Sequence, residues 1–187
     1  MDRNWIISGD SHVLEPEDLF EKALIKKHGD LTPRYVNEHL GNKAKHYFTG
    51  LEYICVDEIV EGDEASAEAA SLQNELLEAS WNSEKRIECL DKDGVWAEVL
   101  NSTWMLYTMR AKNDELVQDC CEVYNDWAHD LVSYDPNRLK ATAMIHMADV
   151  DWAIKELERV YKSGHCSVLI NCDARPEWAP YRDSKYD

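Results

Sequence analysis

The chain has 187 residues, of which 44% are hydrophobic and 30% are charged, and it contains seven Trp and nine Tyr. This composition is that of a folded globular protein, and the length suits one domain or part of one. Twenty Lys and Arg against 37 Asp and Glu leave a formal net charge of −17, which disfavours nucleic acid and anionic membranes as partners.

The sequence also favours a particular compartment. No stretch approaches the roughly 18 apolar residues of a membrane span. Asp10 interrupts the N-terminal segment too early for a secretory signal, so we expect a cytoplasmic protein. The six cysteines form no C-x-x-C pair, which favours reduced thiols buried as small hydrophobic side chains over disulfides or a thiolate metal site.

The first half of the chain predicts a strand, a helix, a hairpin and a second helix. Residues 5–7, Trp-Ile-Ile, predict a short strand that is buried on both faces, and residues 15–29 predict a helix that ends at Gly29. Aromatic and β-branched residues around Thr49 and Gly50 predict a hairpin within 44–60. Residues 65–90 are rich in Ala, Glu and Leu, which predicts a helix that Gly94 terminates.

The second half alternates strands and helices more regularly. Strands are predicted at 95–100, 139–147 and 166–171, with residues 101–104 as a loop, a long helix over 116–131, and no regular period in 172–187. In the helix after residue 147, Asp149 is the predicted N-cap and Gly164 the stop. Its predicted sheet-facing stripe is Ala153, Ile154, Leu157, Val160 and Tyr161. Truncation of Leu157 to Ala should therefore cost roughly 2 to 5 kcal/mol.

Strands that alternate with helices predict a parallel sheet with the helices outside it. In such proteins the functional groups lie at the carboxyl ends of the strands. Asp10 and His12 stand there, and side chains at i and i+2 of extended backbone point to the same side. A carboxylate and an imidazole suit zinc, and also manganese or iron. By itself D-x-H is a common tripeptide, and a hydrogen-bonded pair without metal is the competing interpretation.

A second group of polar residues follows the strand at 95–100. Asn101, Ser102, Thr103 and Trp104 could line a substrate pocket, and Asn101 and Trp104 are the candidates. The alternative is that all four are ordinary loop residues.

Longer segments carry a family resemblance. The string ISGDSHVLEPEDLF (residues 7–20) resembles the opening strand and loop of metal-dependent hydrolases of the amidohydrolase superfamily, in the amidohydrolase-2 branch. That branch also contains the aminocarboxymuconate-semialdehyde and resorcylate decarboxylases. RIECLDKDGVWAEVL (86–100), YNDWAHDLVSYDPNRLKATAMIHM (124–147) and DVDWAIKELERVYKSG (149–164) are similar to later elements of the branch. The similarity covers the chain apart from residues 30–65.

This resemblance implies an α/β fold of the (β/α)₈ TIM-barrel type with a divalent ion in its carboxyl-terminal mouth, most simply zinc. Residues 1–187 would hold about the first four β/α units, with a hairpin and helix insertion at 30–65 and the C-terminal half absent. Asp10 and His12 would be metal ligands, whereas Leu14 stands where relatives carry a second His. Glu15 would either accept a hydrogen bond from a metal ligand and so hold it in place, or cap the helix that starts near Pro16.

The resemblance places the remaining ligands, a histidine from the fifth strand and an aspartate from the eighth, beyond residue 187. His146 is the best placed substitute, but a lone histidine is more often a structural group. The other histidines have no partner at ligand spacing. The sequence assigns no catalytic acid or base.

The expected function is therefore hydrolysis of a small amide, lactone or ester, with this chain alone an inactive half. Decarboxylation of an unsaturated or aromatic acid is the alternative within the branch. Outside it, the alternatives are a non-catalytic α/β binding module and a half barrel that self-associates through its exposed edges. The expected partner is a small-molecule substrate.

Overall fold

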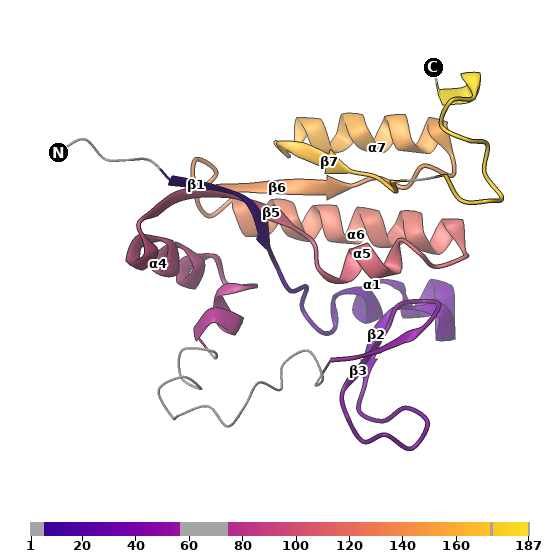
Figure 1. Ribbon diagram of the computed structural model, residues 1–187, viewed down its shortest axis with the longest axis horizontal. Coiled ribbons are helices and arrows are strands. Elements are labelled where there is room, and N and C mark those ends of the chain that lie inside the picture. The colour runs from indigo at the N-terminus through magenta and orange to yellow at the C-terminus, as the bar shows by residue number, and fades with distance from the viewer. Residues whose placement is uncertain (1–5, 57–74, 173, 187) are drawn as a thin grey trace.

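The computed structural model describes residues 6–56, 75–172 and 174–186. Its main sheet has four parallel strands in the order β1, β5, β6, β7 (Figure 1), namely β1 (Ile6–His12), β5 (Val95–Asn101), β6 (Leu139–Met144) and β7 (Ser167–Leu169). The predicted strands are confirmed, with β6 and β7 shorter than expected. Because His12 pairs with Asn101, the carboxyl ends of β1 and β5 lie side by side.

The described helices are α1 (Leu19–His28), α4 (Ser83–Asp93), α5 (Trp104–Thr108), α6 (Asp114–Val132) and α7 (Val150–Lys162). All except the short α5 were expected at these places in the chain. Figure 1 shows α6 and α7 running along the strands β6 and β7. Strand, helix and parallel strand alternate from β5 to β7, and the whole forms half of a (β/α)₈ barrel. Within the part of the chain that the structure describes, no helix has both the length and the apolar composition to cross a membrane.

The predicted helix over 65–90 is wrong as one continuous element. Residues 65–74 lie outside the described part, and the helical turns after them end before α4 begins. Asn82 is extended and its side chain accepts hydrogen bonds from the N–H groups of Glu84 and Lys85, so it starts a new helix. Gly94 ends α4 at φ +73°, as predicted.

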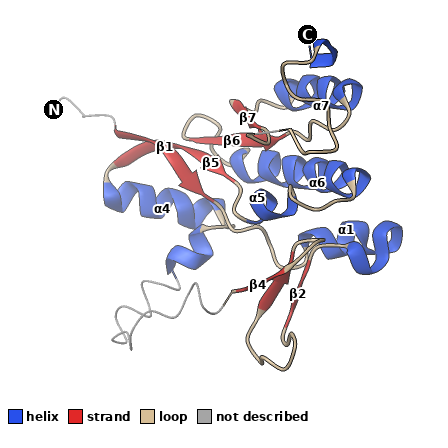
Figure 2. Ribbon diagram, turned by 45° about the vertical axis from the view of Figure 1, so that its right-hand side comes forward, coloured by secondary structure: helices blue, strands red, loops and turns tan. Residues whose placement is uncertain are grey.

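Residues between β1 and α4 build a second, antiparallel sheet in the order β2, β3, β4 (Figure 2), namely β2 (Arg34–Val36), β3 (His46–Phe48) and β4 (Tyr53–Cys55). The predicted hairpin is confirmed as β3 and β4, although residues 57–60 lie outside the described part. The third strand, β2, was not predicted. Gly50 turns the hairpin at φ +87°, and a Cβ there would lie 3.0 Å from Leu116.

The main core lies between the sheet, α5 and α6. Its fully buried members include Leu100, Met105, Leu116, Val117, Tyr124 and Leu139. Cys120 and Cys121 also lie here, and burial raises the pKa of both thiols. The expectation of buried cysteines is confirmed for these two, whereas Cys55 and Cys89 are half-buried and Cys166 and Cys172 are exposed.

The first strand is not buried on both faces as predicted. Ile6 is 54% exposed and Ile7 is 64% exposed, and Trp5 lies outside the described part. In the described chain β1 is an edge strand that pairs with β5 alone, so side chains near its start have few atoms to pack against.

The cap predicted for α7 is confirmed, and so are Ala153 and Val160 of its predicted sheet-facing stripe, whereas the other three residues of the stripe are exposed. The Asp149 side chain accepts hydrogen bonds from the N–H groups of Asp151 and Trp152. The residues that face the sheet are Ala153, Glu156 and Val160, whereas the predicted Ile154, Leu157 and Tyr161 are 52%, 45% and 78% exposed. Glu156 takes the buried position because its carboxylate accepts hydrogen bonds from Asn125, at 2.7 Å, and from Arg159.

Candidate functional site

The candidate site lies where β1 and β5 end. Its carboxylate, Asp10, is 3.8 Å from Nε2 of His12 and accepts a hydrogen bond of 3.0 Å from the amide of Asn101. The three side chains meet because Asp10 and His12 lie two residues apart on β1 and Asn101 is the register partner of His12. The Asp10 side chain is 87% exposed and that of His12 45% exposed, so both are accessible to a ligand.

The His12 ring is held by the connection that follows β5. Its Nδ1 lies 3.1 Å from the backbone carbonyl oxygen of Ser102 and 3.4 Å from the Thr103 hydroxyl. A carbonyl only accepts hydrogen bonds, so the neutral ring carries its proton on Nδ1 and has its lone pair on Nε2, beside Asp10. This orientation is the one that metal-binding histidines usually adopt.

A buried ion pair holds the backbone at the end of β1. Arg86 on α4 and Glu98 on β5 are 9% and 4% exposed, and two guanidinium nitrogens donate to the two carboxylate oxygens. Arg86 also donates to the carbonyl of His12, at 3.0 Å, and to that of Ala79. The pair thus fixes the backbone that carries the candidate ligand. Sequence reasoning missed it, although a glutamate inside the apolar strand VWAEVL was an available signal.

Glu15 caps the short helix α5. Its buried carboxylate accepts hydrogen bonds from the Ser102 hydroxyl and from the N–H groups of Trp104, at 3.1 Å, and Met105, at 3.2 Å. It therefore caps α5, whereas the N-cap of α1 is Asp18, so the alternative in which Glu15 caps a helix that starts near Pro16 is wrong. Burial raises the pKa of Glu15, and these hydrogen bonds oppose that rise.

Glu15 is linked to His12 through a single residue. Ser102 holds the His12 ring with its carbonyl and Glu15 with its hydroxyl. Of the other candidate pocket residues, Asn101 binds Asp10 and Thr103 approaches His12. Trp104 is not in a loop as predicted but begins α5, and it lines a cavity of about 480 Å³.

His146 lies beyond the end of β6 and is fully buried. Its Nε2 is 2.9 Å from Asp114, its ring packs edge-on against Trp178, and Asp114 also binds Arg175. Burial lowers the pKa of His146, while the hydrogen bond to Asp114 opposes the shift. These contacts join the last segment of the chain to the start of α6, in line with a structural role.

The ligand atoms of the site are of the types that bind a divalent ion, but there are too few of them for a catalytic ion. Asp10 offers carboxylate oxygens and His12 a free imidazole nitrogen, which suit zinc or manganese. Among the residues that the structure describes, no three His, Cys, Asp or Glu side chains gather where they could hold one ion. A catalytic zinc usually has three protein ligands, so the pair is one ligand short.

The parallel sheet, its helices and a site at the strand ends define the class of the protein as a partial (β/α)₈ barrel. No protein-family model matches the sequence. Among solved structures, an amidohydrolase from Mycobacterium avium subsp. paratuberculosis K-10 is similar at a TM-score of 0.66 and 18% identity, over 89% of this chain and 50% of that one.

Two decarboxylases are similar as well. A 2,6-dihydroxybenzoate decarboxylase from Rhizobium matches at a TM-score of 0.55 and 16% identity, over 97% of this chain and 44% of its own. A dihydroxybenzoic acid decarboxylase from Polaromonas sp. JS666 was solved with bound manganese and the inhibitor 2-nitroresorcinol. It matches at a TM-score of 0.58 and 17% identity, over 98% of this chain and 44% of its own. The chain therefore spans about half the length of these proteins, and their fold is the barrel that the sequence resemblance implied.

Proposed function

We propose that residues 1–187 form the first half of a metal-dependent hydrolase barrel of the amidohydrolase-2 type. The substrate would be a small amide, lactone or ester. The observation that carries this proposal is the orientation of His12, whose Nδ1 is held by Ser102 so that Nε2 and Asp10 present two ligand atoms at the end of β1.

Each neighbouring side chain has a defined part in this proposal. Asn101 holds Asp10, Ser102 fixes the proton of His12, and Arg86 holds the His12 backbone. A divalent ion, when bound, would lower the pKa of a water molecule and polarise a substrate carbonyl. Zinc is the expected ion, and manganese is the second choice because the Polaromonas protein binds it.

Decarboxylation of an aromatic acid is the second candidate. It is favoured by the names of two of the similar proteins and by the aromatic cavity that Trp104 lines. Two ligands alone hold an ion weakly, so we propose that the chain by itself turns over neither kind of substrate.

The test is metal binding by the purified chain, followed by calorimetry with zinc and with manganese. We expect one weakly bound ion, and we expect its binding to be lost when Asp10 and His12 are both changed to Ala. A matched control is the adjacent pair on α6, changed as His129→Ala and Asp130→Ala, which should leave binding unchanged. Equal stoichiometry in the Asp10/His12 variant would contradict the assignment, and no binding in any variant would favour a non-catalytic binding module.

The reaction is tested separately with an amide, a lactone, an ester and 2,6-dihydroxybenzoate. Turnover by the chain alone that vanishes on His12→Ala would contradict the inactive-half proposal while supporting the site.

A further inference from the structure

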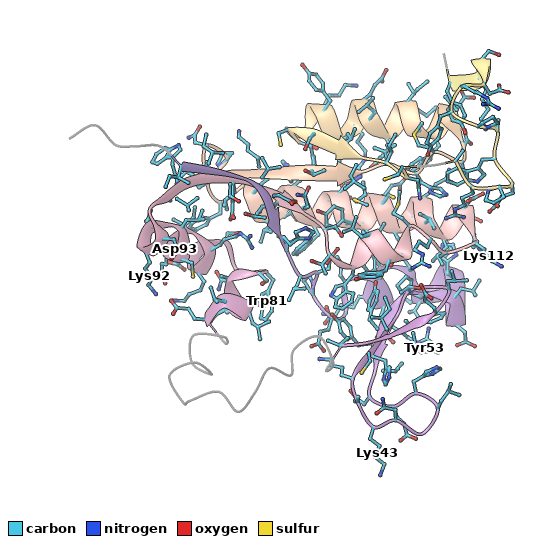
Figure 3. All side chains as sticks on the ribbon, in the orientation of Figure 1. Lys43, Tyr53, Trp81, Lys92, Asp93 and Lys112 are labelled. Atoms are coloured by element: carbon cyan, nitrogen blue, oxygen red, sulfur yellow. The ribbon has the colours of Figure 1, made fainter. Side chains whose placement is uncertain are left out.

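The cavity beside Trp104 has the size and lining of a small-molecule pocket. Its volume of about 480 Å³ is within the usual range for such pockets. It lies between the connection after β1, the antiparallel sheet, α5 and the segment before α4, where Figure 3 labels Trp81. The apolar and aromatic residues that line it include Leu14, Tyr35, Val56, Leu77, Trp81 and Trp104.

The aromatic residues are placed at different depths. Trp104 is 4% exposed and packs edge-on against Tyr35, with ring centroids 5.9 Å apart. Trp81 is 46% exposed. A ring that enters would therefore meet aromatic surface both at the buried end and near the opening, and edge-to-face contacts of this kind are favourable.

The charged side chains that line the cavity already have hydrogen-bond or ion-pair partners within the protein. Glu17 accepts a hydrogen bond from Lys45, whose ammonium also lies 4.9 Å from the centre of the Tyr35 ring. Asp18 is paired with Lys22 at 2.6 Å, and the Glu15 carboxylate accepts hydrogen bonds from the start of α5. A charged ligand group would have to displace one of these pairs, so the cavity favours an uncharged ligand.

The walls of the cavity are continuous with the candidate metal site. Leu14 follows His12 by two residues, and Trp104 follows Ser102, which holds the His12 ring, by two residues. The two segments that position the site therefore also line the cavity.

We propose that this cavity binds the uncharged aromatic ring of a small molecule, as in a phenol. That this ring belongs to a substrate rests on the proposed function, but binding of the ring requires no metal.

The experiment is titration of the metal-free chain, followed by ¹H–¹⁵N NMR, with phenol, cyclohexanol, benzoate and benzylamine. We expect phenol to bind about two- to tenfold more tightly than cyclohexanol, as aromatic contacts of ordinary strength provide. Benzoate and benzylamine should bind more weakly than phenol. Trp81→Ala, a change at a partly exposed position, should weaken phenol binding by a similar factor, whereas Tyr134→Ala, an exposed aromatic residue outside the lining, should not.

The proposal is overturned if cyclohexanol binds as tightly as phenol, if Trp81→Ala has no effect, or if benzoate binds most tightly and loses that affinity on Lys45→Met. The variant with both Asp10 and His12 changed to Ala separates the two proposals. In that variant we expect metal binding to be lost and phenol binding to be retained. Phenol binding by the unchanged chain without any metal binding would leave this inference standing and refute the proposed function, and metal binding by the unchanged chain without phenol binding would show the reverse.

Discussion

Arg86 and Glu98 show how a residue far from a ligand atom can position it. Their pairing joins α4 to β5, and a third guanidinium bond reaches the carbonyl of His12. The sequence predicted that Asp10 and His12 point to the same side, because that follows from strand geometry alone. It did not predict Arg86, Asn101 or Ser102 as partners, since these contacts depend on how distant segments pack.

We expect Arg86→Met to cost about 3 to 5 kcal/mol of unfolding free energy, because it leaves Glu98 buried without its partner. The double variant Arg86→Met, Glu98→Leu should cost less than Arg86→Met alone. Urea unfolding of the single and double variants measures the coupling. Lys85→Met, at an exposed pair with Glu88, is the control and should cost less than about 1 kcal/mol. Additive costs in the double variant would contradict the argument.

At the scale of elements, the sequence predicted where α7 begins and ends better than which face it buries. The residues Ile154, Leu157 and Tyr161 and the buried set Ala153, Glu156 and Val160 have the same spacing, one residue apart. The predicted stripe combined the first set with Ala153 and Val160 of the second and left out Glu156, because glutamate is rarely buried. The second set faces the core because Asn125, on α6, binds both Glu156 and the backbone of Met144. That partner is 31 residues away and leaves no local pattern.

This correction changes the expected effect of truncating α7. Val160, 1% exposed, should lose about 1 to 3 kcal/mol on change to Ala, because its methyl groups are buried. Leu157, 45% exposed, should lose less than about 1 kcal/mol, rather than the 2 to 5 that the sequence alone suggested. Thermal unfolding of the two variants measures both losses of stability. A larger loss for Leu157→Ala than for Val160→Ala would show that Leu157 faces the core, as the sequence predicted.

At the scale of the whole molecule, the parallel α/β class was predictable because it depends on the order of elements along the chain, whereas the barrel was implied by the family resemblance. The exposure of β1 was not predictable, because burial depends on neighbours that lie elsewhere. In the described chain β1 and β7 are the edges of the sheet, and Ile7 and Val168 on them are 64% and 43% exposed. Apolar edge strands favour association, whereas the net charge of −17 opposes it.

We therefore expect self-association to increase with salt. Light scattering after size exclusion should give a larger mean mass at about 0.5 M than at about 0.05 M salt, since screening weakens the repulsion between acidic copies. Ile7→Lys should reduce this increase. Leu40→Lys, which changes a residue that is 92% exposed away from the main sheet, should not. A mass that is independent of salt in all three proteins would show that the edges do not associate.

The pairing of β1 with β5 also has a consequence for folding kinetics. These strands meet across roughly 90 residues of chain, whereas β2, β3 and β4 pair with near neighbours in sequence. Long loops close slowly, so we expect the antiparallel sheet and the unit from α6 to β7 to form first and β1 to dock late. Asp10, His12 and Asn101 then come together only after the rate-limiting step. An ion that binds Asp10 and His12 should accordingly slow unfolding and leave the folding rate nearly unchanged.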